Sequence, residues 1–368
     1  MKNLFESSRI NSLELKNRFV RSATWEGMAT EDGAVTPQLI RTMQDLAEGE
    51  VGLIIPGHIY VQPRGKASPW QLGIYKDELL EGLGELTQAV HSAGGKILAQ
   101  LAHAGHFTSE DLAGGPPMVA SDFEGLSSSP RHEISKEDLQ DLIQDFARAA
   151  GRAKQAGFDG VQIHSAHGYL LSQFLSPAFN KRSDEYGGDI ENRSRLHLEI
   201  LQAIRREVGE DYPVMVKINS RDFDDYGLSA EDSLQVGKLL ANSGLDAIEL
   251  SGGLLTGGKL SPSRPKIDSP EKEAYFSSEA HIFKQNIDLP LILVGGIRSY
   301  EKAEEVVNEG IADYISMSRP LIREPALVKR WQEGDLRPAE CVSDNLCFKP
   351  AMEGKGIYCL TREKESQT

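Results

Sequence analysis

Hydrophobic and polar positions recur along the chain in one order: a helical stretch, a glycine, one to three further residues, and a short run rich in β-branched residues. This order occurs in the segments 47–57, 92–101, 155–164, 242–252 and 308–318. In each segment the glycine lies where a helix can end in a residue of positive φ, and a strand follows almost at once. The pattern therefore predicts helices that alternate with strands.

Three further apolar segments complete a set of eight predicted strands. NRFVRSA (17–23) precedes the others, and VMVKI (214–218) and LILVGG (291–296) are continuous apolar runs, which is typical of buried parallel strands. Eight βα units in one run favour an α/β fold of the (β/α)8 TIM barrel type, with a single domain. An open doubly wound sheet would more often carry a G-x-G-x-x-G motif, and the sequence has none. We assign residues 1–335 to the barrel, with a cap segment at its N-terminus, and residues 336–368 to a C-terminal tail.

One predicted helix is defined well enough to test residue by residue. In the segment 135–157, Ser135 can cap the N-terminus of the helix. The apolar residues that share one face of this helix are Leu139, Leu142, Ile143, Phe146, Ala147 and Ala150. This face should pack against the barrel.

The composition excludes some classes of protein. The 40 basic and 55 acidic residues give a formal net charge of −15, which argues against binding to nucleic acid or to anionic lipid. No apolar run approaches the roughly 18 residues that a membrane helix needs, and the first twelve residues lack the apolar core of a signal peptide. All three cysteines lie after residue 340. An odd number of cysteines without a secretory signal predicts a cytoplasmic protein rather than a disulfide framework.

In a (β/α)8 barrel the active site forms at the C-terminal ends of the strands. The segments LVGGIRS (293–299) and SMSRP (316–320) follow strands seven and eight and offer Gly295, Gly296, Ser318 and Arg319. Barrels commonly bind phosphate at this place, because backbone N–H groups and a helix N-terminus converge there. The alternative is that the two glycines form only a tight turn.

The segment HSAHGY (164–169) places two histidines and a tyrosine at the end of strand four. One interpretation is a zinc site to which His103 and His106 contribute further ligands. A second is a solvated polar loop without chemistry. The third is that His164 and His167 donate hydrogen bonds to a substrate oxygen while Tyr169 supplies a proton. A carbonyl compound that takes up a hydride by conjugate addition develops the negative charge that such donors stabilise, and the hydride would come from a bound nucleotide or flavin.

The chain resembles the old yellow enzyme family of FMN-dependent NAD(P)H oxidoreductases. The resemblance extends from LKNRFVRSA (15–23) to SMSRPLIREP (316–325). Its most specific part is H-S-A-H-G-Y-L-L-S-Q-F-L-S-P from His164, followed by N-x-R-x-D-E-Y-G-G and E-N-R. The pair of histidines, where other members have His and Asn, is similar to the bacterial branch that includes ene-reductases and the barrel domain of 2,4-dienoyl-CoA reductase.

The resemblance implies FMN as a noncovalent cofactor, NAD(P)H as the reductant, and a role for each matched residue. His164 and His167 would hold the substrate carbonyl above the flavin, and Tyr169 would deliver a proton. Gln100 would bind the pyrimidine edge of the flavin, and Lys217 would place a cation beside flavin N1 and O2. The other residues that we assign to FMN binding are Ala23, Thr24, Gly57, Gly295, Gly296, Ser318 and Arg319. The family also implies a homo-oligomer, a dimer or a tetramer.

The chain departs from the family after strand one, where Trp25 stands at the place of the usual Cys or Thr near flavin O4. We interpret Trp25 as a wall of the substrate pocket. The later part of the motif is interpreted as scaffold: Asp184, Glu185, Asn192 and Arg193 should form ion pairs and helix caps that shape the loop.

A second departure is the cysteine pattern of the tail, Cys341-x2-Asp344-x2-Cys347-x11-Cys359. Relatives such as 2,4-dienoyl-CoA reductase and trimethylamine dehydrogenase carry four cysteines at similar spacing for a [4Fe–4S] cluster. Here Asp344 replaces the second cysteine. The two alternatives are a cluster with an aspartate ligand and, as we favour, three free thiols without a metal.

The resemblance predicts an ene-reductase, which reduces the C=C bond of α,β-unsaturated carbonyl compounds by ping-pong hydride transfer. Two other functions remain open. One is an amine dehydrogenase or demethylase, for which Trp25 could bind a small cation through its ring. The other is a flavin-carrying electron-transfer subunit of a larger complex.

Overall fold

A computed structural model describes residues 3–366. Its centre is a sheet of nine strands that are all parallel, in the order β4-β3-β13-β12-β11-β10-β9-β6-β5. The strands are β3 (Phe19–Arg21), β4 (Leu53–Ile54), β5 (Ile59–Tyr60), β6 (Ala99–Ala102), β9 (Val161–Ser165), β10 (Val214–Asn219), β11 (Ala247–Ser251), β12 (Leu291–Val294) and β13 (Tyr314–Met317). Each of the eight segments in which the sequence predicted a strand contributes to this sheet.

The sheet curls round until its two ends meet. The end strands β4 and β5 are consecutive in the chain. β4 lies within the predicted segment 47–57, and β5 lies just beyond its end. Ile54 in β4 also forms a parallel bridge with Ile97, just before β6. The predicted TIM barrel is therefore confirmed, with a second strand that is interrupted at residues 55–58. This interruption lies at the mouth of the barrel.

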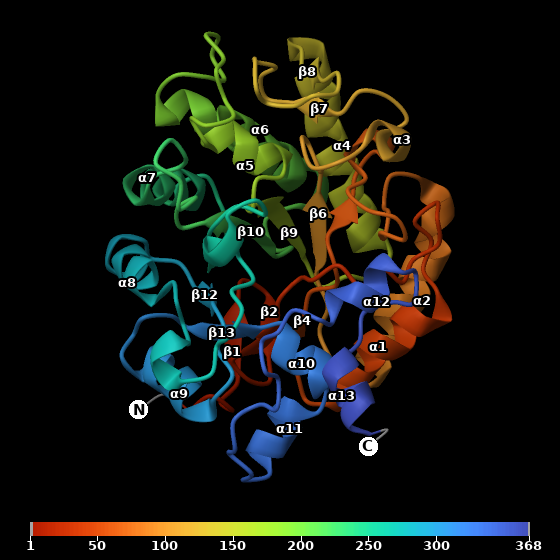
Figure 1. Cartoon of the computed structure of the whole chain (residues 1–368), viewed down its shortest axis with the longest axis vertical. Coiled ribbons are helices and arrows are strands. Elements are labelled where there is room, and N and C mark those ends of the chain that lie inside the picture. Colours follow the sequence, from red (N-terminus) through yellow and green to blue (C-terminus); the bar gives the residue numbers. More distant parts are fainter. Residues whose placement is uncertain (1–2, 367–368) are drawn as a thin grey trace.

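Helices surround the strands, as Figure 1 shows. The outer helices are α1 (Pro37–Glu48), α2 (Leu80–Ser92), α4 (Lys136–Gln155), α6 (Ile190–Val208), α7 (Ala230–Ala241), α8 (Ser277–Asn286), α9 (Tyr300–Asn308), α10 (Arg319–Arg323) and α11 (Leu327–Gln332). Smaller elements lie in the loops: α3 (Glu110–Ala113), α5 (Leu170–Leu175), β7 (Met118–Val119), β8 (His132–Glu133), and the 3-10 turns Pro63–Gly65, Asp77–Leu79, Gly258–Leu260 and Pro270–Lys272.

Helix α4 begins and packs as its sequence predicts. The Ser135 hydroxyl accepts a hydrogen bond from the backbone N–H of Asp138, and the Asp138 carboxylate accepts one from the backbone N–H of Ser135, which is a capping box. All six residues of its predicted apolar face are buried. Burying this face against the barrel stabilises the helix more than its intrinsic propensity does.

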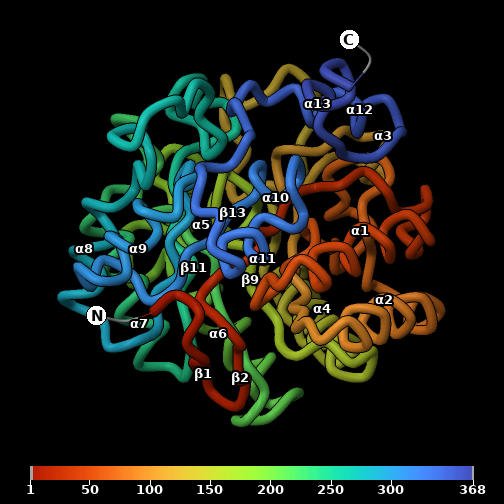
Figure 2. The backbone as a smooth tube through the Cα atoms, turned by 90° about the horizontal axis from the view of Figure 1, so that it is seen from below, coloured from red at the N-terminus to blue at the C-terminus, as the bar shows by residue number. Residues whose placement is uncertain are grey.

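The bottom of the barrel is closed by an antiparallel hairpin of β1 (Ser8–Ile10) and β2 (Leu13–Leu15). Ile10, Leu13 and Leu15 are buried in one apolar cluster with residues from the N-terminal ends of the barrel strands, among them Val20 and Met215. In Figure 2 the hairpin lies at one edge of the molecule, and the tail helices α12 (Phe348–Met352) and α13 (Leu360–Glu365) lie at the opposite edge. The apolar bottom leaves the mouth as the end where polar chemistry is possible.

The C-terminal tail packs against the mouth of the barrel. The backbone N–H of Ile357 donates to the Glu26 carbonyl at 2.7 Å, and that of Lys266 donates to the Ser343 carbonyl at 3.0 Å.

Across residues 3–366, no helix combines the length and the apolar character that a membrane crossing requires.

Candidate active site

A cavity of about 360 Å³ opens at the C-terminal ends of the barrel strands. Most of the residues that we predicted for the site line it: Ala23, Thr24, Trp25, Gln100, His164, His167, Tyr169, Lys217, Gly296, Ser318 and Arg319. Gly57 and Gly295 do not line it. These residues come from segments far apart in the sequence, so only the closed barrel brings them together.

His164 and His167 face each other with their ring centroids 5.4 Å apart. His164 lies in β9, and His167 begins the following loop with φ 66°, a left-handed conformation that is uncommon outside glycine. The backbone N–H of His167 donates to Asn219 Oδ1 at 3.1 Å, and its Nε2 lies 2.8 Å from Ser251 Oγ. These contacts with β10 and β11 hold the strained residue in place.

Both imidazoles are uncharged at neutral pH. Burial holds the pKa of His164 well below its usual value, and the nearby His167, His58 and Lys217 lower it further. Burial and the Lys217 cation do the same to the pKa of His167. Each ring therefore carries one N–H, which suits a donor of hydrogen bonds rather than a cation.

The zinc interpretation has no set of ligands among residues 3–366, where no three His, Cys, Asp or Glu side chains are grouped for a metal ion. His103 and His106 do not line the cavity. His103 is buried, and its Nδ1 accepts a hydrogen bond from the backbone N–H of Gly105 at 3.1 Å. His106 packs edge-on against Phe107.

Tyr169 lies beside this pair and contacts a third histidine. Its ring centroid is 4.9 Å from that of His164, and its hydroxyl lies 3.1 Å from His58 Nε2. Burial raises the pKa of Tyr169 and lowers the pKa of His58 to about 4. Sequence analysis gave His58 no role. Its only signal was its position directly after Gly57, where the second predicted strand ends.

The floor of the cavity is a buried polar network around Glu249, in the middle of β11. Glu249 is fully buried, and its Oε1 accepts hydrogen bonds from Ser22 Oγ at 2.6 Å, Ser316 Oγ at 3.0 Å and Lys217 Nζ at 3.1 Å. Burial acts to raise the pKa of Glu249, but Lys217 and the other donors outweigh it and hold the pKa below its usual value. Glu249 and Lys217 therefore form a buried ion pair, which sequence analysis missed although Glu249 interrupts an apolar strand.

The network extends to Gln100, whose Nε2 donates to Gln162 Oε1 at 2.7 Å. The Nε2 atom of Gln162 donates in turn to Glu249 Oε2 at 2.8 Å. Gln100 in β6 and Lys217 in β10 are thus joined through β9 and β11. The chain of contacts fixes an amide and a cation at the floor of one cavity.

Anion-binding groups lie at the ends of β12 and β13. Gly296 has φ 73°, and a Cβ atom there would lie 2.6 Å from the Tyr275 ring, so that only glycine fits. Arg319 Nη1 donates to Asn345 Oδ1 at 2.7 Å, and the hydroxyls of Ser318 and Thr24 lie 2.5 Å apart. A guanidinium, two hydroxyls and a glycine backbone are a suitable donor set for a phosphate group.

Gly57, which we predicted to bind FMN, lies outside the cavity lining and contacts a buried carboxylate. Its backbone N–H donates to both carboxylate oxygens of Glu26, at 2.9 and 3.0 Å, and Glu26 is paired with Arg21 at 2.8 Å. A Cβ atom at position 57 would lie 2.4 Å from Glu26 Oε2. Glycine is therefore needed for the close approach of this carboxylate, and its N–H already has a partner.

The outer wall of the cavity combines Trp25 with two residues of the tail helix α12, Phe348 and Met352. Gly27 lies between them, since a Cβ atom there would lie within 3.2 Å of both the Trp25 ring and Ala351. The location of Trp25 agrees with a role as a pocket wall. The sequence did not predict this contribution of the tail, because the few apolar residues there do not recur at the spacing of an amphipathic helix.

The cysteines of the tail do not form a ligand set in the described part of the chain. Cys341 and Cys347 are buried and Cys359 is half-buried, all without disulfides. Asp344 is engaged elsewhere, because its carboxylate accepts from Thr361 Oγ1 at 2.6 Å and from the backbone N–H of Leu346 at 3.0 Å. Burial raises the pKa of Cys347 to about 12. Three free thiols stay a prediction, which iron and sulfide analysis after anaerobic purification would test.

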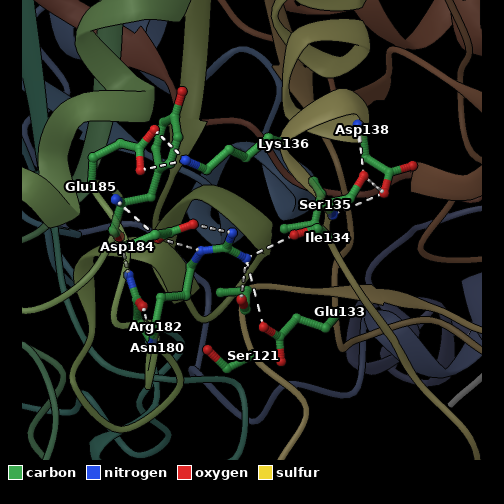
Figure 3. Close-up of polar contacts among 12 residues, drawn as sticks. Ser121, Glu133, Ile134, Ser135, Lys136, Asp138, Asn180, Arg182, Asp184 and Glu185 are labelled. Atoms are coloured by element: carbon green, nitrogen blue, oxygen red, sulfur yellow. Dashed lines mark hydrogen bonds and ion pairs between the residues drawn. The ribbon is translucent and has the colours of Figure 1, made fainter.

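The charged side chains of the loop after the site contact one another and neighbouring segments, as Figure 3 shows, which agrees with the predicted scaffold role. Arg182 binds both carboxylate oxygens of Asp184, at 3.0 and 2.6 Å, and donates to the Ile134 carbonyl at 2.7 Å. Glu185 pairs with Lys136 at 2.7 Å. Further along, Arg193 pairs with Asp232 at 2.6 Å, and the cap of α6 is Asp189, which accepts from the backbone N–H of Asn192. These residues have protein partners and lie outside the cavity lining.

Comparison with known proteins identifies the family. The sequence profile of the NADH:flavin oxidoreductase / NADH oxidase family matches residues 3–337. The chain is 37% identical to an NADH oxidase of Thermoanaerobacter brockii over 358 residues, which are 94% of this chain and 53% of that protein. It is also 37% identical to an NADPH dehydrogenase of Bacillus subtilis over 326 residues, 88% of this chain and 92% of that protein.

Among solved structures, an old yellow enzyme homologue from Zymomonas mobilis superposes with a TM-score of 0.78 at 27% identity, covering 96% of this chain and 99% of that one. The chain thus spans about half the length of the NADH oxidase and nearly all of the other two relatives. The chain belongs to the NADH:flavin oxidoreductase / NADH oxidase family, the old yellow enzymes, whose cofactor is FMN and whose reductant is NAD(P)H.

Proposed function

We propose that the chain reduces the C=C bond of α,β-unsaturated carbonyl compounds with electrons from NAD(P)H. The observation that carries the proposal is the placement of two neutral, buried imidazoles beside the phenol of Tyr169 in one cavity. Two neutral donors stabilise an oxygen on which negative charge develops, and a phenol can protonate the α-carbon of the resulting enolate. A cationic amine would gain nothing from these donors.

The residues present fit FMN. Arg319, Ser318 and the backbone of Gly296 would bind its phosphate, and Gln100 and Lys217 would bind the polar edge of its ring system, with Ala23 and Thr24 beside the ring. When bound, FMN supplies the hydride for the β-carbon of the alkene. Lys217 would offer its positive charge to the reduced cofactor, which carries negative charge, and Glu249 holds Lys217 in position.

The side chains of this protein perform the remaining tasks. His164 and His167 bind the carbonyl oxygen of the substrate and stabilise the enolate charge on it. Tyr169 transfers its hydroxyl proton to the α-carbon. Trp25, Phe348 and Met352 form the apolar wall that shields the alkene from water.

Turnover of a simple enone tests this proposal. Under anaerobic conditions the purified chain, loaded with FMN, should oxidise more than one equivalent of NADH or NADPH per flavin only when cyclohexenone is added. Cyclohexanone should accumulate in equal amount to the NAD(P)H oxidised in turnover. The double variant His164→Ala/His167→Ala should lose this turnover. If NAD(P)H oxidation stops at one equivalent per flavin although cyclohexenone is present, the proposal is contradicted.

A second candidate function is a flavin-carrying electron-transfer subunit of a larger complex. The NADH oxidase that the chain matches is longer, and the chain spans 53% of it. This candidate predicts that the loaded chain passes electrons to an artificial acceptor such as ferricyanide but not to an alkene. The two readouts separate the candidates in one preparation.

A further inference from the structure

His58 occupies a fixed place at the mouth of the barrel, and the reaction proposed above gives it no role. It lies in the interruption between β4 and β5, and its backbone carbonyl accepts a hydrogen bond from Gln71 Nε2 at 2.9 Å. The preceding Gly57 is held by the Glu26 carboxylate. His58 is 7% exposed, and it lines the cavity. A non-repetitive segment that is anchored on both sides thus presents one imidazole to the site.

This imidazole meets the phenol that we propose as the proton donor. Tyr169 Oη and His58 Nε2 are 3.1 Å apart, and the two ring centroids are 5.1 Å apart. Within residues 3–366 this is the one hydrogen bond of the Tyr169 hydroxyl. Tyr169 is itself fixed, because helix α5 begins directly after it.

The environment of the pair makes the phenolate of Tyr169 costly. The tyrosine is 9% exposed, and burial raises its pKa. Two titratable groups face the pair: His164 in β9, whose ring contacts both His58 and Tyr169, and His167 in the loop after β9. Lys217 from β10 acts on these two histidines. Phe107 contributes an apolar edge to Tyr169. A phenol in such a site can give up its proton only if a nearby donor stabilises the oxygen that remains.

We propose that His58 is a positioning residue that donates its Nε2–H to Tyr169 Oη, directs the phenol proton toward the substrate, and stabilises the phenolate after transfer. The inference rests on the proposed function of Tyr169. In the step itself, the Tyr169 O–H bond breaks, a C–H bond forms at the α-carbon, and the electron pair of the O–H bond stays on Oη. A proton from water then restores the phenol.

The neutral state of His58 supports this role. Burial lowers the pKa of His58 to about 4, so at neutral pH the ring has one N–H and one lone pair. An Nε2–H leaves the hydroxyl proton of Tyr169 free for the substrate. The other tautomer would accept that proton and turn it away from the substrate, so the two tautomers make opposite predictions.

Titration of residue 169 distinguishes the tautomers without any substrate. A 3-fluorotyrosine at position 169, followed by 19F NMR in the FMN-loaded protein, reports the pKa of the phenol. A donor to the phenolate lowers that pKa, so His58→Phe should raise it by about one unit or more, and His58→Gln, which keeps an N–H donor, should raise it less. An unchanged or lowered pKa in His58→Phe would overturn the proposal.

Rapid kinetics test the role in the reaction. In His58→Phe, reduced protein mixed with cyclohexenone should reoxidise about tenfold or more slowly, and His58→Gln should recover most of the rate. In the Tyr169→Phe background, His58→Phe should have no further effect. The matched control is His281→Phe, an exposed histidine of α8, which should leave the rate unchanged.

The outcomes separate the two proposals. If the 19F titration behaves as expected but no enone is reduced, the proposed function fails and the His58–Tyr169 pair stands. The other outcome is that the enone is reduced, and that His58→Phe slows the reaction by the same factor with Tyr169 as in the Tyr169→Phe background. In that case His58 has only a structural role, and the inference fails.

Discussion

The segment from His164 to Arg195 has two halves that differ in the number of titratable side chains and in how those groups are partnered: residues 164–179 hold three and residues 180–195 hold nine. In the second half, Arg182 and Asp184 form a two-point ion pair, and Lys136 reaches across to Glu185. In the first half, His164 and Tyr169 are buried in a cavity, and burial itself shifts their pKa values toward the uncharged forms. Charge density alone thus does not mark a reactive site. Buried groups that keep unused hydrogen-bonding capacity beside a cavity do.

The largest expected effect lies in the first half. Tyr169→Phe should slow reduction of cyclohexenone by about 10²–10⁴-fold, because the reaction loses its proton donor while the ring stays in place. Stopped-flow reoxidation of the reduced protein measures this rate. The reduction of bound flavin by NADPH, measured separately, should remain fast. Equal slowing of both half-reactions would mean that the variant disturbs the site in general.

The next largest effect should appear in ligand binding. A phenol such as p-hydroxybenzaldehyde should bind to the oxidised protein as phenolate and give a long-wavelength charge-transfer band. His164→Ala should weaken this binding by about 1–3 kcal/mol, the usual loss for a hydrogen bond to a charged group. Because burial lowers the pKa of both imidazoles, binding should not strengthen between neutral and mildly acidic pH. Stronger binding in that range would show that a histidine becomes charged.

Arg182 in the second half should affect stability and not chemistry. Its side chain is 7% exposed, and it donates to Asp184 and to the carbonyls of Ala120 and Ile134. Arg182→Met should therefore lower the free energy of unfolding by about 1–3 kcal/mol, since buried acceptors lose their donor. Denaturant unfolding of the loaded protein measures this loss. A normal rate of enone reduction in the same variant is the expected companion result.

The smallest effect should come from Lys136. Its ion pair with Glu185 lies at the surface, with 63% and 45% of the two side chains exposed. Exposed pairs contribute little because water and salt screen them. Lys136→Met should leave both the melting temperature and the rate of enone reduction unchanged. A clear loss of stability would weaken the contrast with Arg182.

The fold could be predicted from the sequence because its signal is local. Each helix of the repeat ends near a glycine and each buried strand is a short apolar run, as at Gly157 before β9. The capping box of α4 and its six apolar residues also depend only on neighbours within one helix. Such signals survive in a single sequence.

The parts that were missed depend on contacts between distant segments. His58 and Tyr169 are 111 residues apart. Glu249 binds partners from four other segments of the chain: Ser22 directly after β3, Gln162 in β9, Lys217 in β10 and Ser316 in β13. The resemblance assigned Gly57 to the cofactor, but it gave no sign that a carboxylate 31 residues earlier in the chain accepts the hydrogen bond of its N–H. The periodicity of apolar residues along the chain does not predict these contacts, because they form only when the barrel brings distant segments together.

The buried carboxylate of Glu249, at the floor of the cavity, fixes the orientation of the side-chain amides of Gln162 and Gln100. Ionised Glu249 can only accept hydrogen bonds, so Gln162 must turn its NH2 group toward it and its carbonyl oxygen away. Gln100 must then offer its own NH2 group to Gln162, which leaves the carbonyl oxygen of Gln100 for the ligand. The ring edge that we propose for this place has an imide N–H, which needs such an acceptor. The negative charge of Glu249 thus orients two amides in turn. As a result, the floor of the cavity presents a hydrogen-bond acceptor to the ring edge of the cofactor.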